Sequence, residues 1–359
     1  MRLVRRNALW TAILLLAPMS FLATEASGGT AVAPSAGEDR ARAAEPASRS
    51  RPIPSVKALA EQLPCTLDFF DVHGSAAFLI RPKGEAASSP MPWVWYAPVI
   101  GHPNTSHAWM LKQWLEKGIG MAGVDVGESH GSPQGRKVYT ALWETLTTRY
   151  RMAERACLLP QSRGGLMLYN WAIENPGRVA CIAGIYTVCD LRSYPGLARA
   201  CGAYSLSVSE LEAHLAEHNP IDRLSPLAKA GVPILHVHGD ADTVVPLEKN
   251  SGELARRYRA LGGNVRLIVI PGKGHQVCAE FFQCQELVDF VAAHRPVEHA
   301  GDRLPRSQNP RDAQRTGRSG RGPDERRCDS RSASLRLSAP RGWSAQRPGI
   351  HLRGDGAVP

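Results

Sequence analysis

The chain has 359 residues, with 43 Lys and Arg residues against 33 Asp and Glu residues and a formal charge of +10 at neutral pH. That length allows one large domain or two small ones. The positive excess lies in residues 1–60 and 296–359, because residues 61–295 contain equal numbers of both signs. The charge therefore gives no sign of a nucleic-acid-binding core. The composition also excludes a collagen, a coiled coil and a polytopic membrane protein.

The first 26 residues have the pattern of a secretory signal peptide. Three arginines precede an apolar run over residues 8–23, which is short for a helix that spans a bilayer. Small residues suited to cleavage follow near residue 26, or as late as residue 33. We therefore predict a secreted or periplasmic protein that has no stable membrane insertion after cleavage. An uncleaved membrane anchor is the alternative.

Two further stretches lack hydrophobic periodicity. Residues 27–60 are rich in Ala, Ser, Pro, Glu and Arg, which predicts a disordered linker. Residues 296–359 contain no lysine and many Arg, Ser, Pro and Gly residues, which predicts a disordered basic tail. Out-of-frame translation of GC-rich DNA is a second interpretation of this tail, and the absence of any repeat favours it.

The chain contains eight cysteines. An exported protein meets an oxidising compartment in which thiols can pair, but the sequence does not define a pairing. The sequence contains no CxxC motif, which argues against a zinc ribbon and against thioredoxin-like chemistry.

Apolar strand patterns alternate with helical patterns between residues 61 and 295. A His-Gly-Ser turn at residues 73–75 separates the first two strands, which predicts an antiparallel hairpin. Strands are expected at residues 66–72, 76–81, 93–97, 119–126, 156–159, 179–186, 234–238 and 265–270. Helices are expected at residues 107–117, 141–154, 163–175, 247–261 and 281–294. This order predicts one α/β domain over residues 61–295, with a mostly parallel sheet, helices on both faces and a small lid at residues 190–224 between strands six and seven.

Candidate catalytic side chains follow three of the predicted strands. Ser162 lies in the segment LLPQSRGG between a strand and a helix, Asp242 lies in HGDADTVVP, and His275 ends the segment PGKGH. Because ligands bind beyond the carboxyl ends of strands in open parallel sheets, these three residues are expected at one edge. A serine needs a neighbouring base to become nucleophilic, and an imidazole needs a carboxylate to fix its tautomer.

These three segments, in the order Ser, Asp, His, make residues 66–295 resemble the α/β-hydrolase family, and within it the esterases and the catalytic domains of prolyl oligopeptidases. The resemblance implies an α/β-hydrolase fold with Ser162 as nucleophile, Asp242 as acid and His275 as base. One departure is Pro160, which stands where the G-x-S-x-G motif of the family has its first glycine. An ordinary helix cap is the alternative role of Ser162.

An oxyanion site needs donors close to the nucleophile. The backbone N–H of Arg163, at the start of a helix, is the first candidate. Val99 is the second, with Ile100 as its alternative, because the proline before Val99 has no N–H. Glu128 and Tyr186 follow other strand ends and are, together with Ile100, candidates for the substrate pocket.

Two alternatives concern the acid and a metal. Asp240 and Asp190 compete with Asp242 for the role of the acid, although Asp240 is expected to stabilise its own turn. His236 and His238 lie on one face of a strand and could bind zinc, but no third ligand has a characteristic spacing. Neither a metal nor a cofactor is therefore expected.

The sequence thus predicts an exported serine hydrolase that cleaves carboxylic esters through an acyl-enzyme. The expected partner is an ester of a small molecule, a carbohydrate or a polymer, and no nucleic acid. A serine peptidase of the prolyl oligopeptidase type is one alternative, but residues 27–65 are too few for the propeller that such enzymes usually carry. A catalytically inactive binding module with the same fold is the other alternative.

Overall fold

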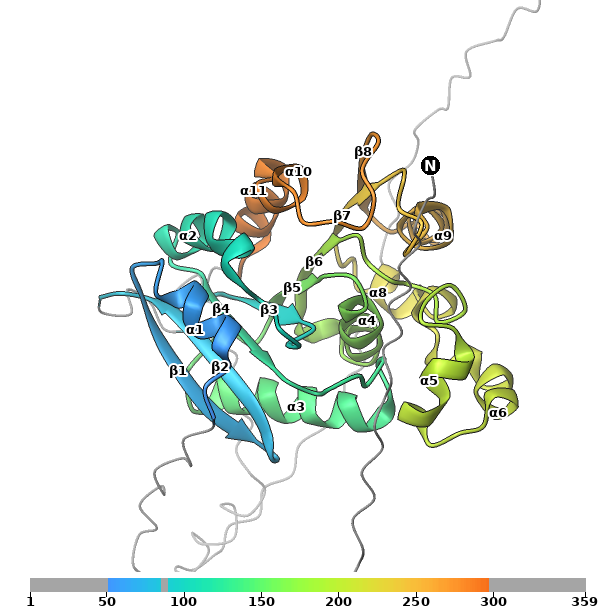
Figure 1. The fold of residues 1–359 in the computed structure, drawn as a ribbon, viewed down its shortest axis with the longest axis horizontal. Coiled ribbons are helices and arrows are strands. Elements are labelled where there is room, and N and C mark those ends of the chain that lie inside the picture. The colour runs from blue at the N-terminus through green and yellow to red at the C-terminus, as the bar shows by residue number, and fades with distance from the viewer. Residues whose placement is uncertain (1–50, 85–89, 297–359) are drawn as a thin grey trace, which may run out of the picture. The chain divides into compact units, whose positions relative to one another are not determined.

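The computed structural model describes residues 51–84 and 90–296 (Figure 1). The predicted signal peptide lies outside the described residues, as do the predicted linker up to residue 50 and the predicted tail from residue 297 onward. Within the described ranges, no helix has the length and apolar character needed to cross a bilayer.

An eight-stranded sheet forms the centre of the described chain, with the strand order β1-β2-β4-β3-β5-β6-β7-β8. The strands β1 and β2 form an antiparallel hairpin, β2 also runs antiparallel to β4, and the other neighbours are parallel. The strands are β1 (Cys65–Val72), β2 (Ser75–Pro82), β3 (Trp93–Ala97), β4 (Gly120–Val124), β5 (Ala156–Pro160), β6 (Val179–Ile185), β7 (Ile234–Gly239) and β8 (Val265–Ile270). The predicted hairpin and the mostly parallel sheet are confirmed.

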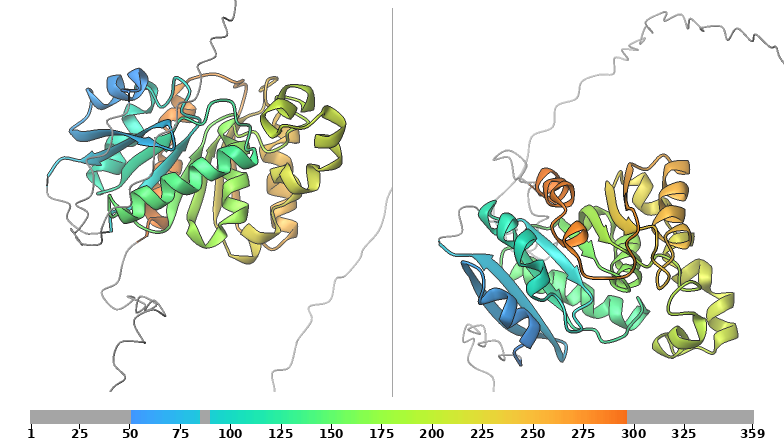
Figure 2. Two further views of the ribbon diagram at one scale, coloured as in Figure 1. Left: turned by 90° about the horizontal axis from the view of Figure 1, so that it is seen from below. Right: turned by 45° about the horizontal axis from the view of Figure 1, so that its top comes forward.

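Helices cover both faces of this sheet, as the two views of Figure 2 show. One face packs against α3 (Pro133–Thr148), α4 (Gly164–Glu174), α8 (Ser225–Lys229) and α9 (Ser251–Ala260). The other face packs against α1 (Pro54–Ala60), α2 (Ala108–Glu116), α10 (Ala279–Phe282) and α11 (Gln285–His294). The central strands β3, β4, β5 and β6 are buried at every position, as expected for strands that are covered on both sides.

The structure corrects the predicted linker, because residues 54–60 form the helix α1. Pro54 occupies the first helical position, where its missing N–H costs no hydrogen bond. Val56 and Leu59 are fully buried. The short apolar stripe of this helix was hidden in a segment of low hydrophobicity.

The predicted helix boundaries also change. The helix expected at residues 141–154 is α3, which begins at Pro133 because Ser132 caps it by accepting a hydrogen bond from the backbone N–H of Gly135. Three other predicted helices begin with a separate short turn in the structure. These turns are η1 (Thr105–His107) before α2, η4 (Leu247–Lys249) before α9, and α10 before α11. A further 3-10 turn, η2 (Pro176–Arg178), precedes β6.

The chain between β6 and β7 forms a helical insertion where the lid is predicted. It contains α5 (Leu197–Tyr204), α6 (Val208–Ala213), α7 (Leu215–His218) and η3 (Pro220–Asp222). In Figure 1, α5 and α6 lie at the end of the sheet opposite to β1 and β2. The insertion has its own small apolar cluster, which includes Leu191, Tyr204 and Leu211.

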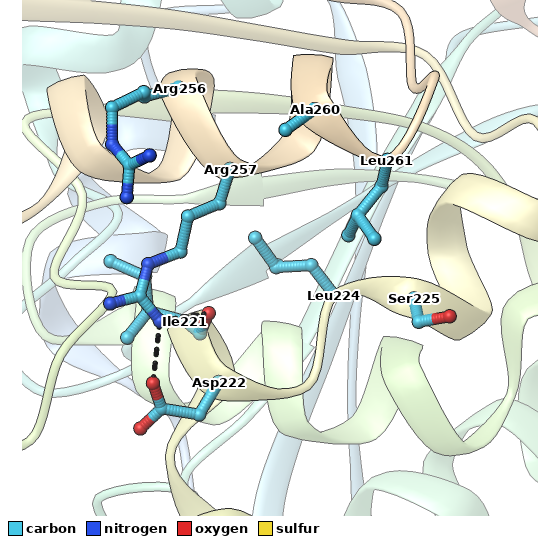
Figure 3. A pocket seen from close by; sticks show the side chains of 8 residues that line it. All are labelled: Ile221, Asp222, Leu224, Ser225, Arg256, Arg257, Ala260 and Leu261. Carbon is cyan, nitrogen blue, oxygen red and sulfur yellow. Dashed lines mark hydrogen bonds and ion pairs between the residues drawn. The ribbon is translucent and has the colours of Figure 1, made fainter.

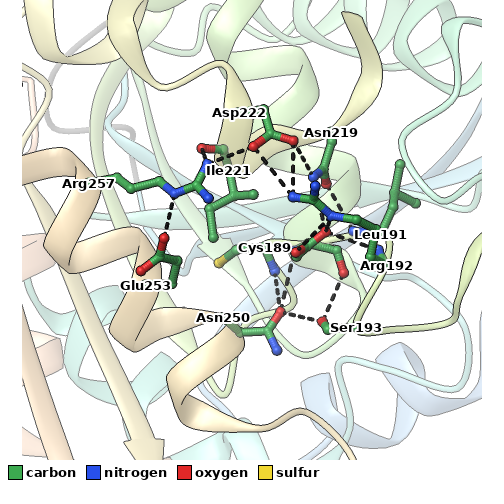
Figure 4. Close-up of polar contacts among 11 residues, drawn as sticks. Cys189, Leu191, Arg192, Ser193, Asn219, Ile221, Asp222, Asn250, Glu253 and Arg257 are labelled. Carbon is green, nitrogen blue, oxygen red and sulfur yellow. Dashed lines mark hydrogen bonds and ion pairs between the residues drawn. The ribbon is translucent and has the colours of Figure 1, made fainter. Parts of the chain in front are cut away.

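A polar network joins the base of this insertion to α9 (Figure 4). The side-chain amide of Asn219 donates to Asp222 Oδ2 over 2.8 Å, and its oxygen accepts the backbone N–H of Leu191 over 2.9 Å. Arg257 of α9 donates to Asp222 Oδ1 over 2.6 Å and to Glu253 Oε1 over 2.7 Å. Hydrogen bonds from Asn219 within the insertion and from Arg257 of α9 therefore hold the base of the insertion in place.

Candidate active site

Three loops at the carboxyl edge of the sheet bring Ser162, His275 and Asp242 together. The distance from Ser162 Oγ to His275 Nε2 is 2.9 Å, and the distance from His275 Nδ1 to Asp242 Oδ2 is 2.8 Å. A carboxylate only accepts, so His275 Nδ1 carries the ring proton and Nε2 accepts from the serine hydroxyl. This arrangement can deprotonate the hydroxyl and stabilise the resulting imidazolium.

The turn that carries Ser162 is tight. Ser162 has a φ of 50°, in the left-handed region that non-glycine residues rarely adopt. A Cβ atom at Gly164 would lie 2.1 Å from the carbonyl oxygen of Ala97, and a Cβ atom at Gly165 would lie 2.1 Å from that of Val188. Both glycines are therefore required for α4 to start so close to the neighbouring strands. Pro160, at the end of β5, does not prevent this turn.

Asp242 is buried and fully engaged in hydrogen bonds. Its Oδ1 atom accepts the backbone N–H groups of Val244 over 3.0 Å and Val245 over 2.8 Å. Burial raises the pKa of this carboxyl, but hydrogen bonds from His238, His275 and the Val245 N–H outweigh burial and hold the pKa well below its usual range. Asp242 is therefore an anion at neutral pH.

The two competing aspartates have other partners. Asp240 Oδ1 accepts the backbone N–H of Gly272 over 2.6 Å, which ties two loops together. Asp190 lies at the base of the insertion, where Arg192 Nε donates to its Oδ1 atom over 2.9 Å. Among the described carboxylates, Asp242 is the one that is hydrogen bonded to His275.

A pocket of about 220 Å³ opens above Ser162. Two of the predicted neighbours, Arg163 and Tyr186, line it, whereas Glu128 forms an ion pair with Arg163 (3.0 Å from Glu128 Oε1 to Arg163 Nε) and is not in the wall. The complete lining is Pro98, His102, Gln161, Ser162, Arg163, Tyr186, His275, Gln276 and Val277. None of these residues belongs to the insertion, so the predicted lid is not a wall of this pocket.

Ile100, a predicted pocket residue, does not line the pocket, and neither does Val99. Val99 is only 2% exposed, and its side chain packs into the core on the α2 face of the sheet. From the same loop, Pro98 and His102 line the pocket instead. The predicted role of Val99 concerns its backbone N–H and stays a prediction, whereas the side chain of His102 was not predicted.

His102 presents a free N–H group. Asn104 Oδ1 accepts the backbone N–H of Ser106 over 3.1 Å, so the amide nitrogen of Asn104 faces His102 Nδ1, 2.9 Å away, and donates to it. Burial, and then the nearby Arg163 guanidinium, lower the pKa of His102. The ring is therefore neutral near pH 7, with its proton on Nε2, which has no acceptor among the described residues.

A second donor lies at the start of α4. The backbone N–H of Arg163 has no acceptor within the described residues, whereas the next N–H, from Gly164, donates to Gln161 O over 2.9 Å. A free N–H at a helix N-terminus, next to the nucleophile, is suited to hold a developing negative charge.

A buried polar network supports the floor of the pocket and was not predicted. Gln161 Oε1 accepts from the Tyr96 hydroxyl over 2.7 Å and from His107 Nε2 over 2.9 Å, and Gln161 Nε2 donates to the Tyr186 hydroxyl over 2.7 Å. The Tyr186 ring packs against His275, with 4.4 Å between ring centroids. In the sequence, this network could have been recognised only from Gln161, a polar residue directly before the nucleophile.

Two larger cavities lie outside this pocket. A cavity of about 300 Å³ lies between α9 and the turn η3 and includes Arg256 and Arg257 (Figure 3), but both arginines are paired with Glu253. A cavity of about 590 Å³ is bordered by Glu128 and by the β1–β2 turn. Neither cavity contains Ser162 or His275.

The other histidines and the cysteines form neither a metal site nor a disulfide among the described residues. His236 and His238 do face the same side of β7, and both lie within hydrogen-bond distance of Ser251 Oγ. In the described ranges, no group of three His, Cys, Asp or Glu residues could hold a metal ion. The seven described cysteines are free thiols.

Comparisons with known proteins agree with the fold. The prolyl oligopeptidase family model matches residues 137–294. S-formylglutathione hydrolase from Agrobacterium tumefaciens superimposes with a TM-score of 0.53 and 16% identity, over 65% of this chain and 96% of that one. A putative dipeptidyl aminopeptidase IV from Bacteroides ovatus gives a TM-score of 0.52 and 16% identity, over 65% of this chain and 36% of that one. Dipeptidyl peptidase 4 from Porphyromonas gingivalis gives a TM-score of 0.51 and 15% identity, over 64% of this chain and 35% of that one.

At these identities the likeness to solved structures shows the fold alone, which is that of the α/β-hydrolases. The chain spans 36% and 35% of the two peptidase structures. It spans nearly the whole length of the S-formylglutathione hydrolase. The search among curated proteins finds no match to this chain.

Proposed function

We propose that this chain, a serine hydrolase whose residues 137–294 form a prolyl oligopeptidase family domain, hydrolyses carboxylic esters with short acyl groups. The observation that carries the proposal is the hydrogen-bonded row of Ser162, His275 and Asp242, of which Ser162 and His275 line a small pocket. The fold, which the chain has in common with an S-formylglutathione hydrolase over most of that enzyme's length, is compatible with it.

The proposed reaction has two halves. His275 Nε2 takes the proton of Ser162 as the serine oxygen attacks the acyl carbonyl, and the same nitrogen then gives that proton to the leaving alcohol. Asp242 keeps the His275 proton on Nδ1 and stabilises the imidazolium. In the second half, His275 activates a water that hydrolyses the acyl-enzyme.

We assign the oxyanion site to the backbone N–H of Arg163 and the Nε2–H of His102. Both donors belong to residues of the pocket wall, and neither has an acceptor among the described residues. His102 takes the place that the sequence suggested for Val99. A neutral imidazole is a suitable donor here because it adds no charge of its own to the site.

The size of the pocket favours small acyl groups. Its volume of about 220 Å³ is below the roughly 300 Å³ at which sites for drug-sized ligands begin. An ester needs only a nucleophile, a base and an oxyanion site, whereas a peptide also needs a binding site for its extended backbone. A peptidase of the prolyl oligopeptidase type is the second candidate, and the family match over residues 137–294 favours it.

We also propose that the protein is exported, on the basis of the signal-peptide pattern in its first 26 residues, which lie outside the described residues. Its substrate would then be an ester of a small molecule, a carbohydrate or a polymer in that compartment.

The decisive experiment compares an ester substrate with amide substrates. The protein should hydrolyse p-nitrophenyl acetate, and kcat/KM on aminoacyl p-nitroanilides should be at least about a hundredfold lower. Ser162→Ala should abolish ester hydrolysis and fluorophosphonate labelling while the circular dichroism spectrum stays unchanged. Equal rates on the ester and the amide would favour the peptidase. Ester hydrolysis by Ser162→Ala would exclude Ser162 as the nucleophile, and an unlabelled wild-type protein would indicate an inactive binding module.

A further inference from the structure

A second histidine contacts the acid from the core side. His238, fully buried near the end of β7, has its Nε2 atom 2.8 Å from the carbonyl oxygen of Val245 and 3.4 Å from Asp242 Oδ2. Both of these oxygens only accept, so His238 Nε2 must carry a proton. One N–H group therefore holds both the carboxylate and the backbone of the loop that presents it.

The other nitrogen of His238 leads to three more buried side chains. His238 Nδ1 lies 2.7 Å from Ser251 Oγ, and His236 Nδ1 lies 2.9 Å from the same oxygen. His236 Nε2 lies 2.8 Å from the hydroxyl of Tyr169. Tyr169, His236 and Ser251 are each at most 1% exposed. They come from α4, β7 and α9, so the row joins one strand to two helices that pack on the same face of the sheet.

The direction of these hydrogen bonds follows from counting protons. If His238 has a single proton, on Nε2, then the Ser251 hydroxyl donates to His238 Nδ1. His236 Nδ1 must in turn donate to Ser251, and the Tyr169 hydroxyl donates to His236 Nε2. Burial, and then the neighbouring His238, lower the pKa of His236 to about 3, which agrees with a neutral ring that has one proton. Every donor in the row then points toward Asp242.

The opposite direction leaves a group without a partner. A second proton on His238 would make Nδ1 donate to Ser251, and the serine would donate to His236. His236 Nε2 would then donate to the Tyr169 oxygen. The Tyr169 hydroxyl would have no acceptor among the described residues, and a buried hydroxyl without a partner is costly. The row therefore has one favoured direction.

We propose that His238 is a positioning residue for Asp242, and that Tyr169, His236 and Ser251 form a one-directional hydrogen-bond chain that fixes its tautomer. This inference rests on the proposed function, since Asp242 matters for catalysis only if His275 is the base. His238 keeps Asp242 Oδ2 directed at His275 while the two backbone N–H groups hold Oδ1. The chain acts on the reaction only through Asp242.

The tautomers can be measured without any activity. In protein labelled with ¹⁵N-histidine, two-bond ¹⁵N–¹H correlation spectra at pH 7 should show the proton of His238 on Nε2 and that of His236 on Nδ1. His236→Asn and His238→Gln assign the two signals. A proton on Nε2 of His236, or a doubly protonated His238, would overturn the chain.

Two replacements separate positioning from simple packing. Gln at position 238 extends about as far as Nε2 and can still donate to Asp242, whereas Asn extends only as far as Nδ1 and can bond Ser251 alone. On p-nitrophenyl acetate, His238→Asn should lower kcat about tenfold with KM within about twofold. His238→Gln should restore kcat to within about threefold of wild type.

Tyr258→Phe is the matched control, because its buried hydroxyl donates to Val232 O over 2.7 Å outside the chain. It should lower the melting temperature without changing kcat. A His238→Asn variant with wild-type kcat, or a His238→Gln variant as slow as His238→Asn, would contradict the positioning role. If His238→Asn does not fold, Ser251→Ala interrupts the same chain, and we expect a loss of kcat; wild-type kcat in Ser251→Ala would then count against the chain.

Failure of the His238 inference and failure of the ester hydrolase proposal give different experimental results. If wild-type protein cleaves no ester but reacts with a fluorophosphonate, the ester assignment fails, and the rates of labelling of the same variants test His238. If wild-type protein is not labelled either, Ser162 is not activated, and the positions of the protons on His236 and His238 still confirm or overturn the chain.

Discussion

Asp240 and Asp242 are separated by one residue and have different tasks in the structure. Asp242 Oδ2 accepts a hydrogen bond from His275 Nδ1–H, whereas Asp240 Oδ1 accepts one from the backbone N–H of Gly272 in the neighbouring loop. Loss of the charge at Asp242 would therefore disturb the tautomer and the charged form of His275 directly. Loss of the charge at Asp240 would weaken one surface contact.

We expect Asp242→Asn to lower kcat on p-nitrophenyl acetate by about three to four orders of magnitude, as for the buried aspartate of serine proteases. Asp240→Asn should lower it less than about tenfold. Steady-state kinetics on both variants check this ranking. The reverse order would move the acid to Asp240, and a large loss in Asp190→Asn alone would move it to the insertion.

His102 allows a separate test of the oxyanion site. Removal of one oxyanion donor typically costs about 10² to 10³ in kcat, so His102→Ala should lose about that much on p-nitrophenyl acetate, with little change in KM. His214→Ala is the control, because His214 is an exposed histidine of the insertion that bonds to Glu217. If His102→Ala and His214→Ala had equal activity, the second donor would lie elsewhere in the pocket wall.

At the scale of elements, the base of the insertion depends on one buried amide. Asn219 is fully buried, its oxygen satisfies the backbone N–H of Leu191, and its nitrogen donates to Asp190 and Asp222. Replacement by alanine removes these bonds and leaves a buried N–H without an acceptor, which costs about 1–3 kcal/mol for that group.

We therefore expect Asn219→Ala to lower the free energy of unfolding by about 2–3 kcal/mol in urea titrations. Asn175→Ala is a suitable comparison, because the side chain of Asn175 is half-buried and donates one hydrogen bond, to Trp171 O. It should cost about 1 kcal/mol or less. Similar losses in the two variants would show that the network in Figure 4 does not hold the insertion.

The elements that the sequence predicted well are those with local signals. The apolar runs of β3, β5 and β6 are continuous, and the structure buries every residue in them. The start of α3 was placed too late because its signal is a single serine before a proline rather than a run of apolar residues. The helix α1 was missed because only a few apolar residues mark its buried side.

In the candidate site, too, the residues with local sequence signals were predicted and the contacts between distant loops were not. Strand ends, chain order and the family resemblance together predicted that Ser162, Asp242 and His275 lie close to one another, and the structure places them within hydrogen-bond distance. The contacts of Gln161 and His102 with their partners depend on how loops distant in the sequence fold against each other. Such contacts leave no periodic pattern, and the sequence therefore gave no sign of His102 as a candidate donor.

At the scale of the whole domain, residues before and after position 137 contribute different parts of the candidate active site. The family match begins at residue 137, within α3, and its range contains Ser162, Asp242 and His275. His102 and the hairpin β1–β2 lie before that range. The part of the chain outside the family match therefore supplies one wall of the pocket, which is where we expect differences in specificity from proteins that the family model describes.

The domain as a whole should lose stability in mild acid, because two histidines are buried as neutral rings. Burial lowers the pKa of His107 to about 4 and that of His236 to about 3. In the unfolded chain both should titrate near about 6.5. As the pH falls below that value, the unfolded chain binds protons that the folded chain does not, so stability is present above about pH 6.5 and is lost toward the folded pKa values.

Each of these histidines should remove about 1.4 kcal/mol of unfolding free energy per pH unit, or about 2 kcal/mol between pH 6.5 and pH 5. Urea unfolding at pH 7, 6 and 5 measures this slope. His107→Gln and His236→Asn cannot take up a proton in this range, so each should flatten the slope by about one proton relative to wild type. Carboxylates contribute equally in all three proteins and cancel in the comparison. Parallel slopes would mean that the two rings are protonated in the folded state, which would also remove the neutral His236 on which the chain to Asp242 depends.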